Sequence, residues 1–265
     1  MRKFLLKNVL TFSLLFFSMV SAMAQDVTYS KETFVFGNTT LPYRKAILPG
    51  VKDKASLVVY LHGGSSKGSD NEKQLEEPAV SSICSWLINN SHKAIILVPQ
   101  CPKDKTWIGT MLGTVRALIR QYIDKGLVDD SKVYLLGGSM GGTGTWNMMA
   151  AYPDLFAATM PVAGNPSGLD AVKVAQTPFY TVMGTADVIL DISAVAAFLS
   201  DMKSYNATYC FDIEQGWTHE DVCKKSYTNE RLSWLFSHIR GVSDGVSAAN
   251  AKQRHVVSTV WYDSK

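Results

Sequence analysis

Short strand patterns alternate with longer helical patterns through most of this chain, and that alternation restricts the possible folds more than any other feature. The expected strands are Thr33–Phe36, Tyr43–Leu48, Ser56–Leu61, Ala94–Val98, Lys132–Leu136, Ala157–Val162, Phe179–Met183 and Thr208–Ile213. The expected helices are Pro78–Asn90, Leu112–Lys125, Met140–Ala151, Ile192–Tyr205 and Asp221–Ile239. Strands joined by crossover helices form a mostly parallel sheet with helices on both faces. The sequence therefore predicts an α/β fold, with an antiparallel lead-in and with functional loops at the carboxyl ends of the strands.

The first 24 residues have the pattern of a secretory signal peptide. Three basic residues lie before or at the start of an apolar stretch, residues 9–20, and Ala22-Met23-Ala24 follows it. The stretch is shorter than the roughly 20 residues of a membrane-spanning helix, and a small-x-small cleavage site closes it. We expect cleavage after Ala24 and a periplasmic or secreted protein with no membrane segment. The mature chain is expected to be one domain, residues 25–265, with residues 241–265 as a C-terminal extension.

Charge does not favour a polyanionic partner. The expected signal peptide contains three of the 26 basic residues and none of the 23 acidic ones, which leaves 23 of each sign in the mature chain. Without a basic excess or a basic cluster, neither nucleic acid nor an anionic membrane is expected as a partner.

The four cysteines, Cys84, Cys101, Cys210 and Cys223, are an even number in a chain expected to leave the cytoplasm. Pairs of cysteines near in sequence, Cys84 with Cys101 and Cys210 with Cys223, are the preferred disulfides, and buried free thiols are the alternative. The spacing does not match a zinc site, so no metal is expected.

A serine lies between glycines where a buried strand meets a helix, in Gly137-Gly138-Ser139-Met140-Gly141. This context is that of a nucleophile elbow, in which a sharp turn exposes the serine hydroxyl. A side chain at Gly137 or Gly141 is expected to collide with neighbouring backbone. The alternative, a phosphate-binding loop, fits poorly because neither the dinucleotide glycine spacing nor a following lysine is present. Ser139 is therefore the candidate nucleophile.

A serine nucleophile needs a histidine base and an acid that orients it. His219 follows the last expected core strand and lies in a loop at the same edge as Ser139. Asp187 follows an intervening strand, which gives the chain order serine, acid, histidine of this kind of enzyme. Asp191 is the rival acid and otherwise reads as a helix N-cap. The histidines not assigned to the base are His62, His92, His238 and His255.

Two backbone N–H groups are expected to form the oxyanion hole. Met140 provides one because it is the first residue of the helix after the nucleophile, and Gly64 provides the other, with Ser65 as its alternative. His62 is interpreted as a residue that braces this loop.

Three tryptophans lie near these motifs. Trp107 and Trp217 are candidate substrate-binding residues at the rim, with core packing as the alternative, whereas Trp146 is expected in the core.

The chain resembles α/β-hydrolase esterases over roughly residues 33–239. The stretches that carry this resemblance are Leu57–Asn71, Leu97–Trp107, Val133–Gly164, Gly184–Asp187 and Gly216–His219. Val98-Pro99-Gln100-Cys101-Pro102 and Gly141-Gly142-Thr143-Gly144-Thr145-Trp146 carry the closest likeness. They are similar to polyhydroxybutyrate-depolymerase-like proteins, feruloyl and acetyl-xylan esterases, and dienelactone-hydrolase-like proteins. The resemblance implies a sheet of about eight strands, a triad of Ser139, Asp187 and His219, and no required cofactor.

The predicted function is hydrolysis of carboxylic esters by a serine esterase, with a small-molecule or carbohydrate ester as partner and acyl groups on plant polysaccharide as one possible substrate. The absence of a long lid insertion argues against a true lipase. A peptidase or amidase acting on short peptides is the second hypothesis, and a non-catalytic binding protein with the same fold is the third.

Overall fold

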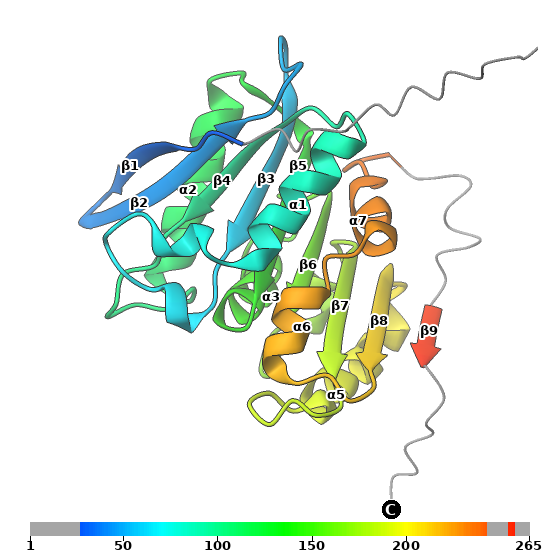
Figure 1. Cartoon of the computed structure of the whole chain (residues 1–265). Helices are drawn as coiled ribbons and strands as arrows, with labels where there is room; N and C mark the ends of the chain where they lie inside the picture. The colour runs from blue at the N-terminus through cyan, green and yellow to red at the C-terminus, as the bar shows by residue number, and fades with distance from the viewer. Residues whose placement is uncertain (1–26, 243–253, 258–265) are drawn as a thin grey trace, which may run out of the picture.

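The computed structural model describes residues 27–242 and the backbone of residues 254–257. Its centre is a nine-stranded sheet (Figure 1). The strands are β1 (Ser30–Phe36), β2 (Thr39–Ile47), β3 (Ala55–Leu61), β4 (Ala94–Pro99), β5 (Val128–Gly138), β6 (Ala158–Val162), β7 (Phe179–Gly184), β8 (Tyr209–Glu214) and β9 (Arg254–Val257). Their spatial order is β1-β2-β4-β3-β5-β6-β7-β8-β9. The pairs β1–β2 and β2–β4 are antiparallel and all the others are parallel, so the predicted lead-in and mostly parallel sheet are confirmed.

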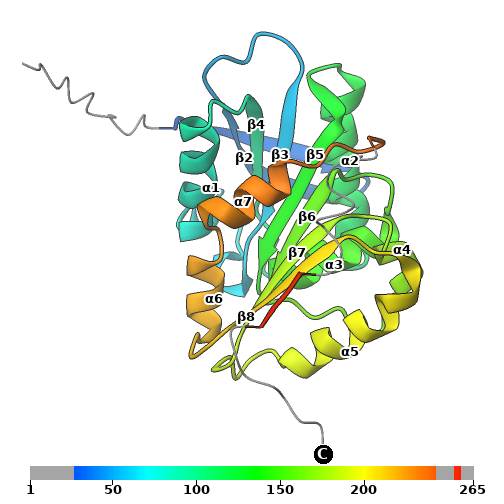
Figure 2. The ribbon, with the colours of Figure 1, turned by 90° about the vertical axis from the view of Figure 1, so that its right-hand side faces the viewer.

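Helices cover both faces of the sheet, as Figure 2 shows. They are α1 (Pro78–Asn89), α2 (Thr110–Asp124), α3 (Met140–Ala151), α4 (Ala171–Val174), α5 (Ile192–Met202), α6 (His219–Lys225) and α7 (Asn229–Phe236). The 3-10 helices are η1 (Gly64–Ser66), η2 (Lys73–Leu75) and η3 (Lys203–Tyr205). One face carries α1, α6 and α7, and the other carries α2, α3, α4 and α5.

The apolar sequence of β3 explains its central place. Every residue from Ala55 to Leu61 is buried, because alternate side chains enter the cores on the two opposite faces of the sheet. Val58 and Tyr60 belong to the core beneath α1 and α7, whereas Leu57 and Val59 belong to the core beneath α2. A strand buried on both sides cannot move without disturbing both cores, so the loop that follows it starts from a fixed point.

The long helix expected over residues 221–239 is wrong in its extent. The structure divides this region into α6 and α7, and α6 already begins at His219. Thr228 interrupts the helix because it adopts an extended conformation as the N-cap of α7, where its side chain accepts a hydrogen bond from the Arg231 N–H. Helix α4 and the 3-10 helices η1 and η2 were not expected from the sequence, whereas α5 and η3 together occupy the helix expected over Ile192–Tyr205.

The expected signal peptide and most of the C-terminal extension lie outside the described residues. Within the part that is described, no helix is long and apolar enough to cross a membrane.

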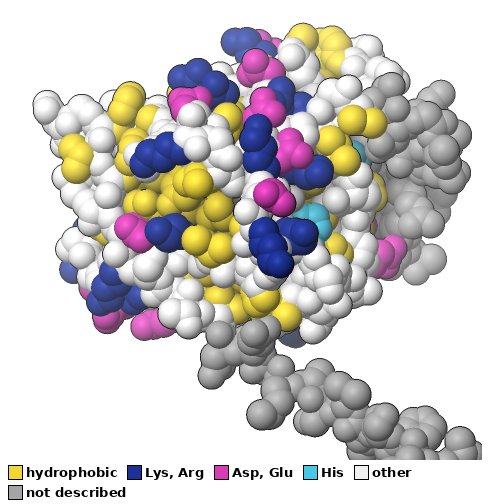
Figure 3. Space-filling view, turned by 90° about the horizontal axis from the view of Figure 1, so that it is seen from above, with side chains coloured by type: hydrophobic (Ala, Val, Ile, Leu, Met, Phe, Trp, Pro, Cys, Tyr) yellow, Lys and Arg dark blue, Asp and Glu magenta, His cyan; other side chains and the backbone are white. Residues whose placement is uncertain are grey.

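The parallel strands β3, β7 and β8 end at the lower side of the view in Figure 1. Figure 3 looks onto the opposite end of the molecule, where basic and acidic side chains are intermixed around an apolar patch. The predicted site residues therefore belong to the end that faces away from the viewer in Figure 3.

Candidate active site

Ser139 occupies a strained turn between β5 and α3. Its backbone has φ 58° and ψ −118°, a conformation that residues with a side chain rarely adopt, and its N–H donates to the Val162 carbonyl at 3.0 Å. Strain of this kind costs on the order of 1–3 kcal/mol and persists only where the surroundings impose it. The turn has the geometry that a nucleophile elbow requires.

Glycines make the turn sterically possible. A Cβ atom at Gly137 would lie 2.4 Å from the Gly141 carbonyl oxygen, and one at Gly141 would lie 1.8 Å from the Leu61 carbonyl oxygen. Both collisions are with backbone, which cannot rotate away, so the expectation for these two positions is confirmed. Helix α3 also approaches its other neighbours closely, because a Cβ at Gly144 would lie 2.3 Å from the Cβ of Trp107.

The structure brings the three predicted residues together. The Ser139 hydroxyl lies 2.7 Å from His219 Nε2, and His219 Nδ1 lies 2.8 Å from Asp187 Oδ2. The side chain of Asp187 is fully buried and that of His219 is 14% exposed. The serine, the histidine and the acid therefore form one continuous hydrogen-bonded chain.

The acid also fixes the state of the histidine ring. Asp187 Oδ2, as a carboxylate oxygen, can only accept, so Nδ1 of His219 donates to it. In the neutral ring Nε2 is then the acceptor and receives the hydrogen of the Ser139 hydroxyl. His219 begins α6, which is held by a capping box in which Thr218 and Asp221 exchange hydrogen bonds.

Asp191, the alternative candidate for the acid, is instead a helix N-cap, which is the second role that the sequence indicated for it. It is the N-cap of α5, and its side chain accepts from the Ser193 N–H at 2.8 Å. Asp187, in contrast, accepts from the Ile189 and Leu190 N–H groups through Oδ1 while Oδ2 faces His219.

The loop after β3 reaches Ser139, the candidate nucleophile. A Cβ built at Gly63 would lie 3.6 Å from Ser139 Cβ, so this loop is in contact with the elbow. The Gly63 N–H is already used, because it donates to Glu77 Oε1 at 2.8 Å. Gly64 begins η1, and Met140 begins α3, where the first N–H groups lack partners inside the helix. This arrangement leaves Gly64 and Met140 as the candidate oxyanion donors.

His62 braces this loop, as expected. The Cys101 N–H donates to its Nε2 at 2.9 Å, which leaves Nδ1 to donate to the Gly63 carbonyl at 2.6 Å. Because Nε2 accepts this hydrogen bond, the ring is neutral, and burial lowers the pKa of His62 from its ordinary value. The histidine thereby joins the ends of β3 and β4.

The assignment of Trp107 to the substrate rim is wrong. Its side chain is buried, with 1% of the residue exposed, and its indole N–H donates to the His62 carbonyl at 3.0 Å. The ring also packs edge-on against His62 and beneath Gly144. Trp107 therefore supports the loop from inside, which is the core-packing alternative. Trp146 lies in the core, as expected.

Trp217 is half-buried, two residues before His219. Its ring lies beneath Lys225 and Arg231, whose charged groups are 5.7 and 6.0 Å from the ring centre. Its carbonyl accepts from the Ala186 N–H, next to Asp187. Trp217 links the acid loop to the histidine loop, and a substrate contact for it remains a proposal.

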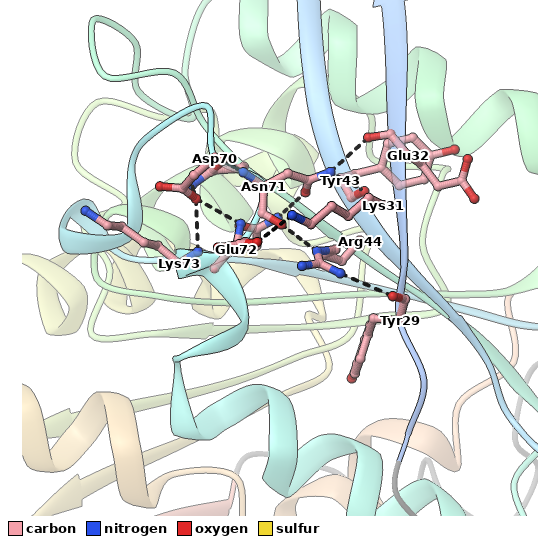
Figure 4. Close-up of polar contacts among 11 residues, drawn as sticks. Tyr29, Lys31, Glu32, Tyr43, Arg44, Asp70, Asn71, Glu72 and Lys73 are labelled. Carbon is pink, nitrogen blue, oxygen red and sulfur yellow. Dashed lines mark hydrogen bonds and ion pairs between the residues drawn. The ribbon is translucent and has the colours of Figure 1, made fainter.

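The part of the β3–α1 loop that follows η1 is tied to β1 and β2 through Asn71, as Figure 4 shows. The side-chain amide of Asn71 donates to the carbonyls of Glu32 and Tyr43, both at 3.1 Å. Its backbone N–H donates to Gln100 Oε1, and its carbonyl accepts from Arg44. Asn71 thus anchors the middle of this loop to β1, to β2 and to Gln100, which follows β4.

Neither preferred disulfide is present, and no disulfide joins cysteines in the described part of the chain. Cys84 lies 2.7 Å from the Tyr29 hydroxyl, and burial raises the pKa of Cys101 to about 12. Cys223 Sγ lies 4.0 Å from His219 Nε2, and burial raises its pKa to about 12, so it is a protonated thiol beside the histidine. The free-thiol alternative describes this structure.

Two of the other histidines lie away from the site. His92 Nε2 contacts the Ser56 hydroxyl at the amino end of β3, and His238 follows α7. The side chain of His255 is outside the described residues. Among the residues that the structure describes, no group of three His, Cys, Asp or Glu side chains could hold a metal ion.

The sheet order, the elbow and the Ser139–His219–Asp187 arrangement define an α/β-hydrolase. Residues 91–254 match the dienelactone hydrolase family, and the chain belongs to this family.

Curated relatives match parts of the chain. It is 29% identical over 180 residues to poly(3-hydroxyalkanoate) depolymerase C of Paucimonas lemoignei, covering 62% of this chain and 41% of the relative. It is 34% identical over 127 residues to an uncharacterized secreted protein of Arthroderma benhamiae, covering 44% of this chain and 13% of the relative. The matched region thus spans less than half of either relative.

Solved structures share the fold. A thermostable esterase superposes with a TM-score of 0.74 at 24% identity, covering 80% of this chain and 63% of that chain. The feruloyl esterase module of Clostridium thermocellum, complexed with sinapinate, gives a TM-score of 0.68 at 16% identity, covering 83% of this chain and 92% of that one. These likenesses support the predicted fold class.

Proposed function

We propose that the protein is a serine esterase that hydrolyses carboxylic esters through an acyl-enzyme on Ser139. The observation that carries the proposal is the continuous hydrogen-bonded chain from Ser139 through His219 to the buried Asp187, at 2.7 and 2.8 Å. A serine hydroxyl is a weak nucleophile by itself, and an adjacent oriented histidine is what activates it.

In the proposed reaction, His219 Nε2 takes the hydroxyl proton as Ser139 Oγ attacks the ester carbonyl carbon. Asp187 stabilises the positive charge that forms on the ring, and the N–H groups of Gly64 and Met140 donate to the oxyanion. When the tetrahedral intermediate collapses, the carbon–oxygen bond to the alcohol breaks and His219 returns the proton to the leaving oxygen. Water then attacks the acyl-enzyme with the same proton transfers and releases the acid.

Replacement of Ser139 by alanine tests the proposal. We expect the variant to lose turnover of p-nitrophenyl acetate by at least about 10³-fold and to melt within a few degrees of the parent protein, because only one hydroxyl is removed. A fluorophosphonate probe is expected to label Ser139 in the parent protein and nothing in the variant. Unchanged turnover in the variant contradicts the assignment.

The alcohol and acyl groups are proposed from the relatives. Acyl groups on plant polysaccharide are one expected substrate class, and the likeness to a feruloyl esterase module supports testing it. Rates on p-nitrophenyl esters of increasing acyl length, on feruloylated polysaccharide and on an aminoacyl amide separate an esterase from a peptidase. A faster rate on the amide than on every ester favours the peptidase.

Export is the remaining part of the proposal. The expected signal peptide, residues 1–24, and the named secreted relative both support a periplasmic or secreted location. N-terminal sequencing of the protein recovered from the periplasm or the medium is expected to begin at Gln25, whereas a chain that still begins at Met1 contradicts cleavage.

A further inference from the structure

Glu77 is an acidic residue whose position in the fold is not explained by its own helix. It is the N-cap of α1, followed by Pro78, but its side chain makes no capping hydrogen bond. Glutamate is also not among the residues preferred at this position, which are shorter and reach the helix N–H groups. The carboxylate points instead toward the loop that follows β3.

Three donors converge on this carboxylate. The Gly63 N–H and the Ser66 hydroxyl donate to Oε1, each at 2.8 Å, and the Tyr60 hydroxyl donates to Oε2 at 2.9 Å. Burial raises the pKa of Tyr60 well above its usual value, and Tyr227 and Glu77 add to this shift, so the hydroxyl keeps its hydrogen. Hydrogen bonds to a charged acceptor are roughly twice as strong as neutral ones. The donors come from the end of β3 and from both ends of the turn that contains Gly64.

The same carboxylate lies next to the nucleophile elbow. A Cβ at Gly63 would be 3.4 Å from Glu77 Oε1 and 3.6 Å from Ser139 Cβ, so both atoms are close to one point. A Cβ at Gly138 would be 3.4 Å from the Tyr60 hydroxyl. Tyr60 therefore lies next to Gly138, the residue that precedes Ser139. Glu77 lies next to Gly63, in the loop that carries Gly64.

We propose that Glu77 is a positioning residue that holds the loop of Gly63 and Gly64 so that the Gly64 N–H is aimed at the oxyanion formed on Ser139. This inference rests on the proposed esterase function. The Gly63 N–H ties the peptide between His62 and Gly63 to the carboxylate, and the Ser66 hydroxyl ties the far end of the turn to the same oxygen. The peptide between Gly63 and Gly64 lies between these two anchors, and its carbonyl accepts from His62 Nδ1 at 2.6 Å and from the Ser66 N–H at 3.3 Å. Glycines at both positions leave the backbone of this turn without side-chain restraint, so the contacts at its two ends have to fix it.

Its effect is expected in the transition state rather than in substrate binding. The ground-state carbonyl needs less from the oxyanion donors than the tetrahedral intermediate does, so a misaligned donor lowers kcat more than it raises KM. Removal of one donor costs about 10²–10³-fold in kcat. A donor that is displaced but still present is expected to cost about 10- to 100-fold.

The test compares Glu77→Ala, Glu77→Gln and the control Glu76→Ala. Glu76 is exposed and adjacent. With p-nitrophenyl acetate, Glu77→Ala is expected to lower kcat about 10- to 100-fold with KM within threefold, and to weaken a trifluoromethyl ketone inhibitor by a similar factor. Glu77→Gln is expected to recover at least part of kcat, because its amide oxygen can still accept from Gly63 and Ser66. Glu76→Ala is expected to behave as the parent protein.

A second variant keeps the test informative if Glu77→Ala does not fold. Tyr60→Phe removes only the hydroxyl that holds Oε2, and it is expected to lower kcat by about threefold or more with KM unchanged. Normal kcat and normal inhibitor affinity in the folded Glu77 variants overturn the inference, even if their melting temperature falls. That result leaves the proposed function intact, whereas full activity of Ser139→Ala overturns the function itself.

Discussion

Asp187→Asn is the substitution that most directly tests how the acid controls the histidine. The carboxylate accepts three hydrogen bonds, from the Ile189 and Leu190 N–H groups at Oδ1 and from His219 at Oδ2. Asparagine has only one acceptor atom, so one side of the new side chain must present an NH₂ group to a donor. Facing this NH₂ toward the loop would leave two backbone N–H groups without their acceptor. Facing it toward His219 affects only one contact.

The second orientation is therefore expected, and it reverses the histidine ring. The NH₂ group donates to Nδ1, so the neutral ring carries its hydrogen on Nε2, which then cannot take the proton of Ser139. Loss of two hydrogen bonds in the other orientation would cost about 1–3 kcal/mol each, which is enough to decide between them. A wrong tautomer costs about 10⁴-fold in kcat in a serine protease with this arrangement. We expect about 10³- to 10⁴-fold here, or about 4–5.5 kcal/mol of transition-state stabilisation.

Steady-state hydrolysis of p-nitrophenyl acetate measures the loss, and ¹⁵N NMR of the His219 ring measures the tautomer. Asp191→Asn is the matched control, because Asp191 also accepts a backbone N–H at a helix start, but its two carboxylate oxygens accept from Ser193, whereas Oδ2 of Asp187 faces His219. Asparagine caps helices as well as aspartate does, so the control is expected to keep its activity and stability. If Asp187→Asn keeps kcat within tenfold, the reasoning about the tautomer is refuted.

Two further predictions concern stability. Gly141→Ala places a methyl group 1.8 Å from the Leu61 carbonyl oxygen and is expected to destabilise the protein by at least about 3 kcal/mol in urea denaturation. Gly113→Ala, in α2, is expected to be neutral or stabilising, because its methyl group would make only ordinary contacts, 3.9 Å from Tyr152 and 4.0 Å from Phe36. An equal effect of the two substitutions contradicts the packing argument. Burial lowers the pKa of His62 below its usual 6.5, so its contribution to stability is complete above pH 6.5 and is lost as the pH falls toward the lower folded value. The unfolding free energy is expected to fall by up to about 1.4 kcal/mol per pH unit below pH 6.5. If a His62→Asn variant shows the same dependence of unfolding free energy on pH as the parent protein, His62 is not the cause.

The sequence was informative where local chemistry determines structure. Helix α3 begins at Met140 and ends at Ala151, as predicted, because the glycines around Ser139 permit the sharp turn that precedes it. The strands were recognisable because buried parallel strands are apolar throughout, as β3 is. The order of serine, acid and histidine then indicated which side chains would meet at one edge.

Contacts between distant segments were not predictable in the same way. Trp107 lies in the segment after a strand, so it was placed at the rim. Its ring turns inward instead, because its indole N–H donates to the His62 carbonyl and the ring packs against Gly144, which has no side chain. Glu77 was missed because its three donors become neighbours only after the loop has folded. An acidic residue directly before Pro78 was the available signal, but it also describes an ordinary helix start.

The close approach of α3 to the sheet limits how this protein can change. Backbone atoms of α3 touch β3 and the segment after β6, and no side chain lies between them at Gly141 and Gly142. Neither Ser139 nor the helix that follows it can be shifted by repacking, because there is no side chain to exchange at these contacts. Selection for a different substrate must therefore act on exposed side chains of the surrounding loops, such as Val188, which is 95% exposed and lines a cavity of about 550 Å³.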